Sequence, residues 1–273
     1  MQSAIDERGH ASIVDDAMRR LVVCWQHPLT RAIEPIGLLS SDDETFRFEY
    51  LARAREVEGF RPLLGFPDLG SSYESKELFP FFAQRVMDPR RPDFARHLQE
   101  LAVEESESTP WELLARTQGK REGDTILLYP VPRQTDEGWQ CVYLVHGIRH
   151  LMTKSVPLGG DSAGPYSPDE IEGILSELSQ GDVLELCPEP SNDWSDTAML
   201  VLDAKGRPFG YVPDLLLEPI HSAMFDGRLH NVVERVNGPE AGWHLRVLVR
   251  AKSADADGLD LLAGEKFKLA TSQ

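Results

Sequence analysis

The sequence contains few cysteines, no long apolar run and no excess of basic residues, and each shortage excludes a class of protein. Its three cysteines, Cys24, Cys141 and Cys187, are odd in number and form no C-x-x-C pair, so neither a disulfide framework nor a zinc cluster is predicted. No apolar stretch approaches the roughly 18 residues of a membrane-spanning helix. Because the N-terminal segment also has no apolar core of signal-peptide length, we expect a soluble cytoplasmic protein with no membrane partner.

The balance of charge is strongly acidic, with a formal net charge of −17 over 273 residues. Non-specific affinity for duplex DNA comes mostly from lysines and arginines that neutralise phosphates, so a broad DNA-coating surface is not predicted. A small site with one or two cations is compatible with this charge. The chain is 41% hydrophobic, which allows a packed core, and its length suits two domains of roughly 100–200 residues each.

Motifs of the common nucleotide-binding and hydrolytic enzymes are also missing. The sequence has no G-x-x-x-x-G-K-S/T loop, no G-x-G-x-x-G and no G-x-S-x-G elbow. His146 and His150 are four residues apart, which suits a metal on a helix, but their surroundings are typical of the end of a strand. We therefore predict no catalytic residue, no cofactor and no metal site, and an enzymatic alternative such as a nuclease or kinase has no residues to support it.

Hydrophobic periodicity divides the chain into a polar extension and two halves. Residues 1–20 are polar, with one short helix expected. Residues 21–135 and 136–273 each contain strand and helix patterns, and the polar stretch 132–138 is the expected domain boundary. The strands are mostly antiparallel, without β-α-β alternation. The predicted fold class is α+β, with two small domains.

Several element boundaries are marked by particular residues. Thr109 and Ser167 each precede a proline and are followed three residues later by a glutamate, the pattern of a capping box at a helix start. Asp93 is expected to cap another helix, with apolar residues along one face of 94–101. Residues 243–250 are predicted to form the last strand.

Four blocks of the second half occur in a fixed order. They are GIRH at 147–150, GDVLEL at 181–186, PEPSNDWSDTA at 188–198 and GYVP at 210–213. In order and spacing, residues 143–250 resemble a HIRAN domain, whose pattern contains Gly-hydrophobic-Arg-aromatic, Gly-Asp-hydrophobic-x-Leu, Arg-Glu-Pro-x-Asn-Pro-Tyr-Asp and Gly-Tyr-hydrophobic-Pro. The resemblance implies an OB-like β-barrel with helices that binds single-stranded DNA ends and recognises a free 3′-hydroxyl.

The resemblance also implies which side chains would form a DNA-binding site. Arg149 takes the position of a phosphate or base clamp, and His150 falls at an aromatic position. Trp194 takes the place of the family's tyrosine as a stacking platform, a contact worth roughly 1–3 kcal/mol per base. Asn192 falls at a polar contact, and Tyr211 lies beside the site.

Two positions of the loop depart from the family's pattern. The arginine before Glu-Pro is Pro188 here, and the acid after the tyrosine is Ser195, with Asp196 one step later. One cation and one acid of the family's pocket are therefore missing or moved. The alternative interpretation is that Trp194 packs on the barrel as a loop anchor and that the DNA site has been lost.

The first half carries a second series of blocks. They are IGLL at 36–39, FRFEYL at 46–51, RPLLGFP at 61–67, LFPFF at 78–82 and WELL at 111–114. Together, residues 21–130 resemble the N-terminal subdomain of HipA-type toxin kinases, although the family's Phe-Phe-x-Asn-Leu-Leu-Pro block reads FFAQRVM at 81–87. All of the kinase's ATP-site elements are absent. The resemblance implies a non-catalytic module that binds a separate HipA-like kinase.

The two resemblances together predict a non-enzymatic regulator. Its N-terminal half would bind a protein partner, and its C-terminal half would bind single-stranded DNA 3′ ends, in a toxin–antitoxin or phage-defence system. The alternative is a nucleic-acid-binding accessory protein of DNA repair with no kinase partner.

Overall fold

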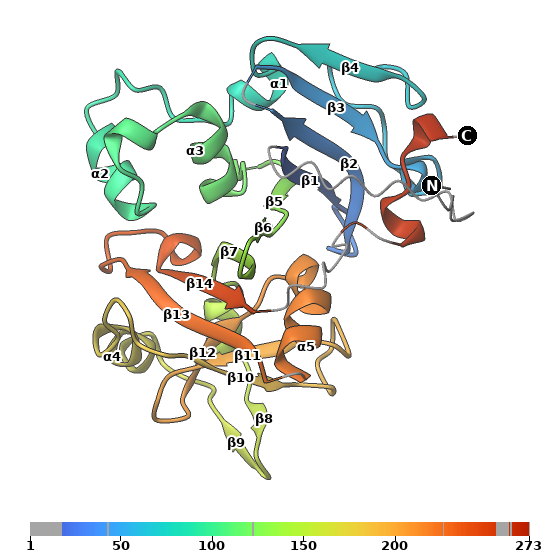
Figure 1. Cartoon of the computed structure of the whole chain (residues 1–273). Coiled ribbons are helices and arrows are strands. Elements are labelled where there is room, and N and C mark those ends of the chain that lie inside the picture. Colours follow the sequence, from blue (N-terminus) through green and yellow to red (C-terminus); the bar gives the residue numbers. More distant parts are fainter. Residues whose placement is uncertain are drawn as a thin grey trace, which may run out of the picture.

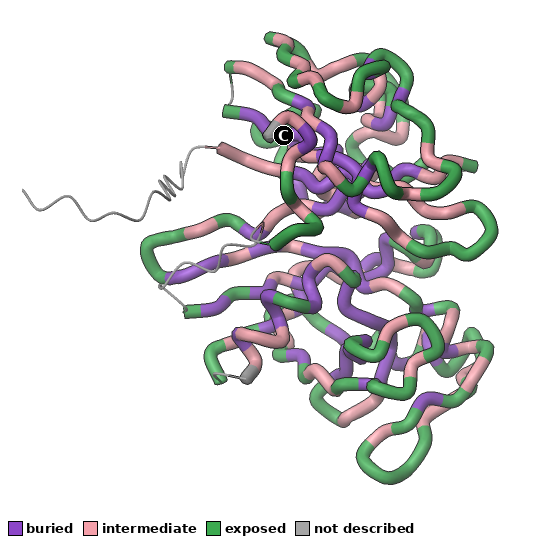
Figure 2. The backbone as a smooth tube through the Cα atoms, turned by 90° about the vertical axis from the view of Figure 1, so that its right-hand side faces the viewer, coloured by how far each residue is buried: buried purple, intermediate pink, exposed green. Residues whose placement is uncertain are grey.

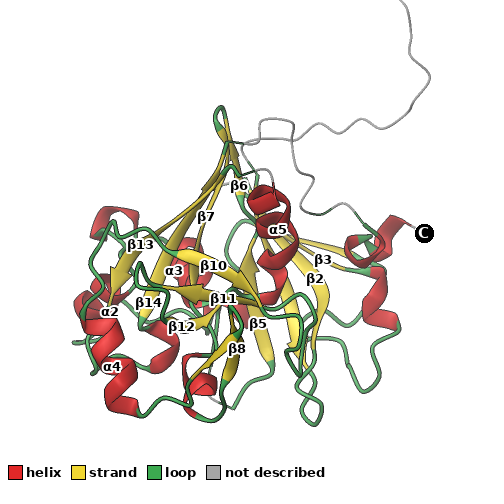
Figure 3. Cartoon of the chain, turned by 90° about the horizontal axis from the view of Figure 1, so that it is seen from below, coloured by secondary structure: helices red, strands yellow, loops and turns green. Residues whose placement is uncertain are grey.

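The computed structural model describes residues 18–42, 44–121, 123–225, 227–254, 262 and 264–272. The helix expected in the polar extension falls on residues outside these ranges. The described chain is α+β, as predicted, and consists of small antiparallel sheets with short helices around them (Figure 1). Seen from below, strands run through the middle of the molecule, and helices lie both at its margins and among the strands (Figure 3).

The first half contains a five-stranded antiparallel sheet in the order β4-β3-β2-β1-β5. Its strands are β1 Arg19–Gln26, β2 Ile33–Ser41, β3 Phe46–Tyr50, β4 Ser72–Ser75 and β5 Ile126–Pro130. Its helices are α1 Pro80–Ala83, α2 Phe94–Glu100 and α3 Pro110–Thr117. Phe48 is fully buried at the centre, and its ring centroid lies 4.6 Å from that of Phe66 and 5.5 Å from that of Phe82. These aromatic contacts hold α1 and the 61–67 segment on one face of the sheet.

The helix starts show how well the capping patterns predicted local structure. Ser167 forms the complete capping box with Glu170. The Thr109 side chain accepts a hydrogen bond from the Glu112 amide at 3.2 Å, but the Glu112 carboxylate binds Arg116 instead of the cap. Asp93 occupies the N-cap position of α2, as predicted, but its carboxylate accepts from Arg91 and makes no cap bond. An exposed arginine two residues away thus competes with the helix amides for the same oxygens.

The second half contains a four-stranded sheet, a three-stranded sheet and a hairpin. The four-stranded sheet, β13-β14-β7-β6, consists of β6 Arg133–Thr135, β7 Gly138–Leu144, β13 Leu229–Val236 and β14 Val247–Ser253. The three-stranded sheet consists of β10 Glu185–Pro188, β11 Met199–Leu202 and β12 Pro208–Tyr211. The hairpin of β8 Val156–Leu158 and β9 Asp161–Ala163 projects from the foot of the molecule in Figure 1. Helices α4 Pro168–Ser176 and α5 Leu217–Phe225 pack on this half.

The last predicted strand begins later than expected. Residues Trp243–Leu245 form a short 3-10 turn, and β14 starts at Val247. This turn lets Trp243 pack against the core of the second half while Leu245 packs toward α2 and α3. A strand would have placed both side chains on the same face, since residues two apart in a strand point the same way.

Single bridges join the two larger sheets of the second half at both edges. His146, just after β7, pairs with Tyr211 of β12, and Val183, just before β10, pairs with Val232 of β13. The strands β7, β14, β13, β10, β11 and β12 therefore form a closed circuit. One hydrophobic core fills it, with residues from every one of these strands buried or packed against it. Figure 2 shows buried backbone segments gathered in the interior of the molecule.

The two halves pack directly on each other. Leu98 and Leu101 of the α2 segment share a buried cluster with Leu144 and Leu248 of the second half. The side chain of Asn237 is 4% exposed and donates to the Glu100 carbonyl at 2.8 Å. The 94–101 helix face is thus occupied within the chain. Residues 132–138, the expected boundary, form β6 and the turn into β7.

The C-terminal segment returns to the first half. Leu269 forms a bridge with Leu51, and the Ala52 amide donates to the Lys268 carbonyl at 2.7 Å. Ala270, 2% exposed, belongs to the core of the first half. The structure therefore places 264–272, which the sequence assigns to the second half, against β3.

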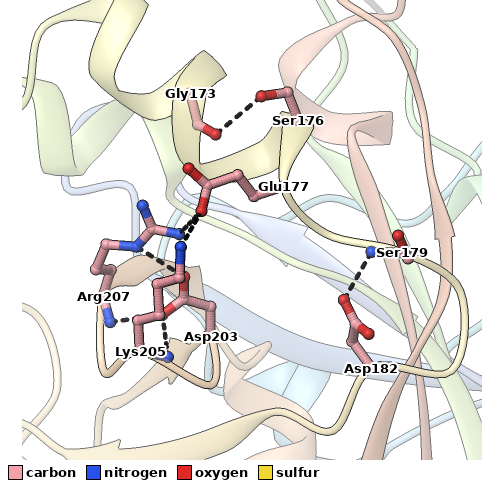
Figure 4. A network of polar contacts seen from close by, with 8 residues as sticks. All are labelled: Gly173, Ser176, Glu177, Ser179, Asp182, Asp203, Lys205 and Arg207. Atoms are coloured by element: carbon pink, nitrogen blue, oxygen red, sulfur yellow. Dashed lines mark hydrogen bonds and ion pairs between the residues drawn. The ribbon is translucent and has the colours of Figure 1, made fainter.

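A network of polar contacts fixes α4 to the turn between β11 and β12 (Figure 4). Asp203 is buried and accepts from the backbone amides of Lys205 and Arg207 at 3.0 and 2.8 Å. The side chains of Lys205 and Arg207 both bind Glu177 at the end of α4. Hydrogen bonds lower the pKa of Glu177 to about 2, with the largest contribution from Lys205 and the next from Arg207. Glu177 is therefore ionised throughout the neutral range.

Candidate functional site

Three segments that carry the predicted site residues meet where the strand circuit closes. The 3-10 turn η3 (Ile148–Met152) follows β7 and contacts β12. The His146 amide donates to the Tyr211 carbonyl at 2.9 Å, and the Tyr211 amide donates to the His146 carbonyl at 2.8 Å. The third segment is the 189–198 loop between β10 and β11. Three separate elements therefore converge at this edge. The η3 turn carries Arg149 and His150, β12 carries Tyr211, and the 189–198 loop carries Asn192.

Two glycines allow this close approach. Gly147 has φ +64, a conformation that L side chains rarely adopt, and a Cβ there would lie 2.7 Å from Tyr211 Cδ2. A Cβ at Gly210 would lie 2.3 Å from Val145 Cγ1 and 2.7 Å from the His146 carbonyl oxygen. The His146 carbonyl cannot move without breaking its bridge to Tyr211, so position 210 requires glycine for the site to form. Position 147 requires glycine because of its positive φ and its closeness to the Tyr211 ring.

We expect Gly210→Ala to lower the free energy of unfolding by about 1–3 kcal/mol, the usual cost of overpacking a well-packed interior. The measurement is urea unfolding of the full chain. Gly173→Ala is the matched control, because a Cβ at this position in α4 meets nothing within 4 Å, and alanine there is expected to be neutral or to stabilise by up to about 1 kcal/mol. Equal midpoints for both variants would contradict the tight approach at Gly210.

The 189–198 loop is held by its own hydrogen bonds and leaves its tryptophan exposed. The Glu189 amide donates to the Ala198 carbonyl at 2.8 Å, which closes the base of the loop. The Asn192 side chain accepts from the Trp194 amide at 3.0 Å. The Trp194 residue is nevertheless 71% exposed. The alternative that this ring anchors the loop on the barrel is therefore not what the structure shows.

Buried polar atoms without partners lie behind the loop. Glu189 is 1% exposed, and its Oε2 accepts from Asn192 Nδ2 at 2.7 Å. Its Oε1, the Tyr211 hydroxyl and His150 Nε2 have no hydrogen-bond partner among the described residues. The rings of His150 and Tyr211 are 6.0 Å apart, edge to face. Burial, and then the neighbouring Glu189 carboxylate, raise the pKa of Tyr211 well above its ordinary value, so its hydroxyl keeps its proton.

Two cations accompany these groups. Arg149 is exposed, and within the described chain its guanidinium makes no hydrogen bond or ion pair. Lys154 Nζ binds Asp193 Oδ2 at 2.8 Å. This hydrogen bond, together with the lysine's charge, lowers the pKa of Asp193. The η3 turn therefore carries a guanidinium group without a partner in the described chain, Lys154 is paired with the loop through Asp193, and the loop carries an exposed aromatic ring.

His146 and His150 face different surroundings. His146 Nε2 lies 2.9 Å from Gln118 Oε1, whereas the His150 ring contacts Tyr211. Burial lowers the pKa of His146 to about 4, with smaller contributions from Lys120 and His244. Among the described residues, no group of three or more histidines, cysteines and acids is placed to hold a metal. No helix of the described ranges combines the length and apolarity needed to cross a bilayer.

Two residues of this site were missed by the sequence interpretation. Lys154 supplies a cation near the loop even though Pro188 replaces the family's arginine. Glu189 was noted only as part of a motif, yet it is a buried acid that accepts from Asn192 and lies near Tyr211. Lys154 follows Arg149 closely in the sequence, and this spacing is the one signal that could have identified the lysine as part of the site.

Comparison with known proteins gives distant structural likenesses. No family model and no curated protein matches the chain. A crystal structure of a protein from Lactobacillus plantarum is 19% identical at a TM-score of 0.30, over 40% of this chain and 87% of that chain. The crystal structure of the HIRAN domain of human HLTF is 14% identical at a TM-score of 0.30, over 48% of this chain and 91% of that chain. Likenesses this distant carry no argument about function.

Proposed function

We propose that the protein is a non-enzymatic binder of single-stranded DNA 3′ ends, and that its HIRAN-like residues 136–273 hold the terminal nucleotides. The observation that carries this proposal is Trp194, a large ring that is 71% exposed on a loop held by hydrogen bonds at its base. Covering this exposed indole with a ligand would remove apolar surface from water and so favour binding. A nucleobase is a suitable cover, because every base has a flat π-face that stacks on an aromatic ring.

The groups around Trp194 suit the end of a strand. Arg149 has five donors and no partner within the described chain, so it is available for a phosphate. The unpaired atoms of Glu189 and Tyr211 are an acceptor and a hydroxyl, and a sugar hydroxyl can satisfy both. Because an unsatisfied buried polar atom costs about 1–3 kcal/mol, filling these positions favours binding. A terminal phosphate would instead place its charge against the Glu189 carboxylate.

Because the chain is acidic and offers few cations to DNA, this proposal predicts that the affinity depends only weakly on salt. Two cations, Arg149 and Lys154, can contact at most about two phosphates. For single strands the logarithm of the affinity falls by about 0.7 per contacted phosphate for each tenfold rise in salt. A slope near −1.4 is therefore expected, far shallower than that of proteins with a broad basic surface.

The test is fluorescence anisotropy with a short labelled single strand that ends in either a 3′-hydroxyl or a 3′-phosphate. We expect the wild type to prefer the hydroxyl end and Trp194→Ala to bind it roughly 5- to 150-fold more weakly, which corresponds to the loss of about 1–3 kcal/mol of stacking. Leu64→Ala is the matched control, because Leu64 is an apolar residue of the first half that is 83% exposed. Binding that is absent, or that Trp194→Ala leaves unchanged, overturns the proposal.

A protein partner for residues 21–135 stays a prediction. No comparison bears on the HipA-type resemblance, and the 94–101 face is already buried against the second half. The finer hypothesis of a HipA-like kinase partner in a toxin–antitoxin or phage-defence system therefore rests on sequence blocks alone. Co-purification of a kinase with the tagged chain would support it, whereas a monomer free of partners in native lysate would favour the DNA-repair alternative.

A further inference from the structure

A cavity of about 240 Å³ lies at the junction of the two halves, remote in sequence from the loop of Trp194. The first half contributes the start of β1, the end of β5 and one face of α3, and the second half contributes β6, β7 and β14. Five arginines line it: Arg19, Arg20, Arg116, Arg133 and Arg250. Glu112 is the single acid among the described residues that line it.

This concentration of charge is anomalous for the chain. The whole sequence has 28 lysines and arginines against 45 acids, so an unselected cavity would be lined mostly by acids. Like charges gathered around one small space repel each other unless an anion lies between them. Arginine is also the residue best suited to phosphate, because its planar fork donates two parallel hydrogen bonds.

Strand register turns two of these arginines toward the first half. Arg133 pairs with Gln140, and Arg250 pairs with Val142, in the β6-β7-β14 part of the sheet. Paired residues project from the same face. The alternate residues of β7, Trp139 and Cys141, lie in the core on the other face. Arg133 and Arg250 therefore point out of the second half and into the cavity.

The arginines combine fixed and free guanidinium groups. Arg250 binds Glu234 of β13 through Nε and Nη2, and Arg116 binds Glu112 through Nε at 2.7 Å. These pairs hold the two side chains in place and leave other donors available. Arg20 and Arg133 make no side-chain hydrogen bond or ion pair with residues that the structure describes. The fifth, Arg19, lies over the Trp111 ring, with its guanidinium carbon 5.3 Å from the ring centroid. Apart from Arg19, an entering anion meets two held and two unengaged guanidinium groups.

We propose that this cavity binds a small phosphate-bearing anion, up to the size of a mononucleotide. Its volume is a little below the roughly 300 Å³ at which pockets for drug-sized ligands begin, which suits a compact ligand. Leu21, Trp111, Ala115, Pro130 and Val142 supply apolar walls, against which a base could lie while the arginines hold the phosphates. Because the walls come from both halves, the bound anion would fix the halves together and raise the thermal stability of the chain.

Isothermal titration calorimetry at low salt tests the proposal with inorganic pyrophosphate and AMP as separate probes. We expect binding of at least one probe, a rise in Tm of several degrees at saturation, and a loss of affinity of at least 10-fold in Arg20→Gln/Arg133→Gln. Tighter binding of AMP would show that the apolar walls hold a base, and tighter binding of pyrophosphate would show that the charge alone is recognised. No heat and no Tm shift at millimolar concentration of either probe overturns the proposal.

Two control variants distinguish binding in this cavity from a general attraction of anions to arginine. Arg61→Gln removes an exposed arginine of the first half that has no partner in the described chain, and it should leave both affinities unchanged. Arg149→Gln should weaken DNA-end binding but not probe binding. An equal loss of probe affinity in all the variants would show general charge attraction and overturn the site. Circular dichroism of the double variant checks its fold, with Arg133→Gln alone as the replacement if the double variant unfolds.

Discussion

Replacing Arg85 by alanine is expected to lower the free energy of unfolding by about 3–5 kcal/mol, the cost of removing one partner of a buried ion pair. The Arg85 side chain is 2% exposed and binds Asp124 at 2.6 Å. It also donates to the Gly119 carbonyl at 3.1 Å and lies over the Phe81 ring. Alanine would leave a carboxylate and a carbonyl unpaired and open a void beside Phe81. The connection between α1, the end of α3 and the start of β5 depends on this one guanidinium group.

Urea unfolding of the full chain measures this loss, and two variants resolve its origin. Arg85→Met keeps the apolar stem against Phe81 and should recover part of the stability, because Asp124 is partly exposed and can be hydrated. Arg90→Ala removes an exposed arginine paired with Asp88 and should have no measurable effect. If Arg85→Ala unfolds at the same urea concentration as Arg90→Ala, the buried pair contributes nothing to stability.

Acidification is expected to destabilise the protein through His146, by up to about 3 kcal/mol between pH 6.5 and pH 4. The pKa of this histidine falls from its ordinary 6.5 to about 4 in the folded chain, mainly because of burial. The unfolded chain therefore binds a proton in this range that the folded chain does not bind. Stability from this group is complete above pH 6.5 and is lost as the pH falls toward 4, at about 1.4 kcal/mol per pH unit.

Among the residues that the structure describes, no acid contributes to the pKa of His146 as a counter-charge. Its ring centroid lies 6.0 Å from that of Tyr129, and its Nε2 faces the Gln118 side chain. Lys120 and His244, the charged or titratable groups that act on it, both oppose protonation. Burial also lowers the pKa of His244, so more than one histidine contributes to the loss.

Unfolding of the wild type and of His146→Gln from pH 4 to pH 8 isolates the contribution of His146. Glutamine does not titrate and can keep a hydrogen bond to Gln118. The wild type should lose stability more steeply than the variant as the pH falls, with the difference concentrated between pH 6.5 and pH 4. Parallel curves would show that His146 is protonated without cost in the folded chain.

Elements set by local pattern were predictable from the sequence. The alternation of apolar and polar residues over 45–51 is typical of a strand and corresponds to β3, and the cap at Ser167 corresponds to the start of α4. Elements that depend on distant partners were not predictable from the sequence. The glycine and serine residues of 159–167 are typical of a loop, whereas β8 and β9 pair across Gly159-Gly160. The 3-10 turn at Trp243–Leu245 also depends on two separate cores, and periodicity in one segment does not indicate a second packing surface.

The candidate site was predictable as a set of motif positions, and their placement in three meeting segments follows from the fold. Burial is what the sequence could not show. Glu189 and Arg85 are charged residues in a chain rich in charge, and nothing in their neighbours marks them as buried. The arginines of the cavity are scattered from position 19 to position 250, and strand pairing within two separate sheets, together with the packing of α3 and of the two halves, brings them together.

The return of residues 264–272 to the first half has a consequence for synthesis on the ribosome. Ala270 completes the core of the first half, although translation adds it 140 residues after Pro130 of β5. At roughly 5–20 residues per second, that interval is on the order of 10 seconds. Throughout it, the surface of β3 that the late segment covers stays open to chaperones and to other nascent chains. The first half thus reaches its final form only after nearly all of the second half has been translated.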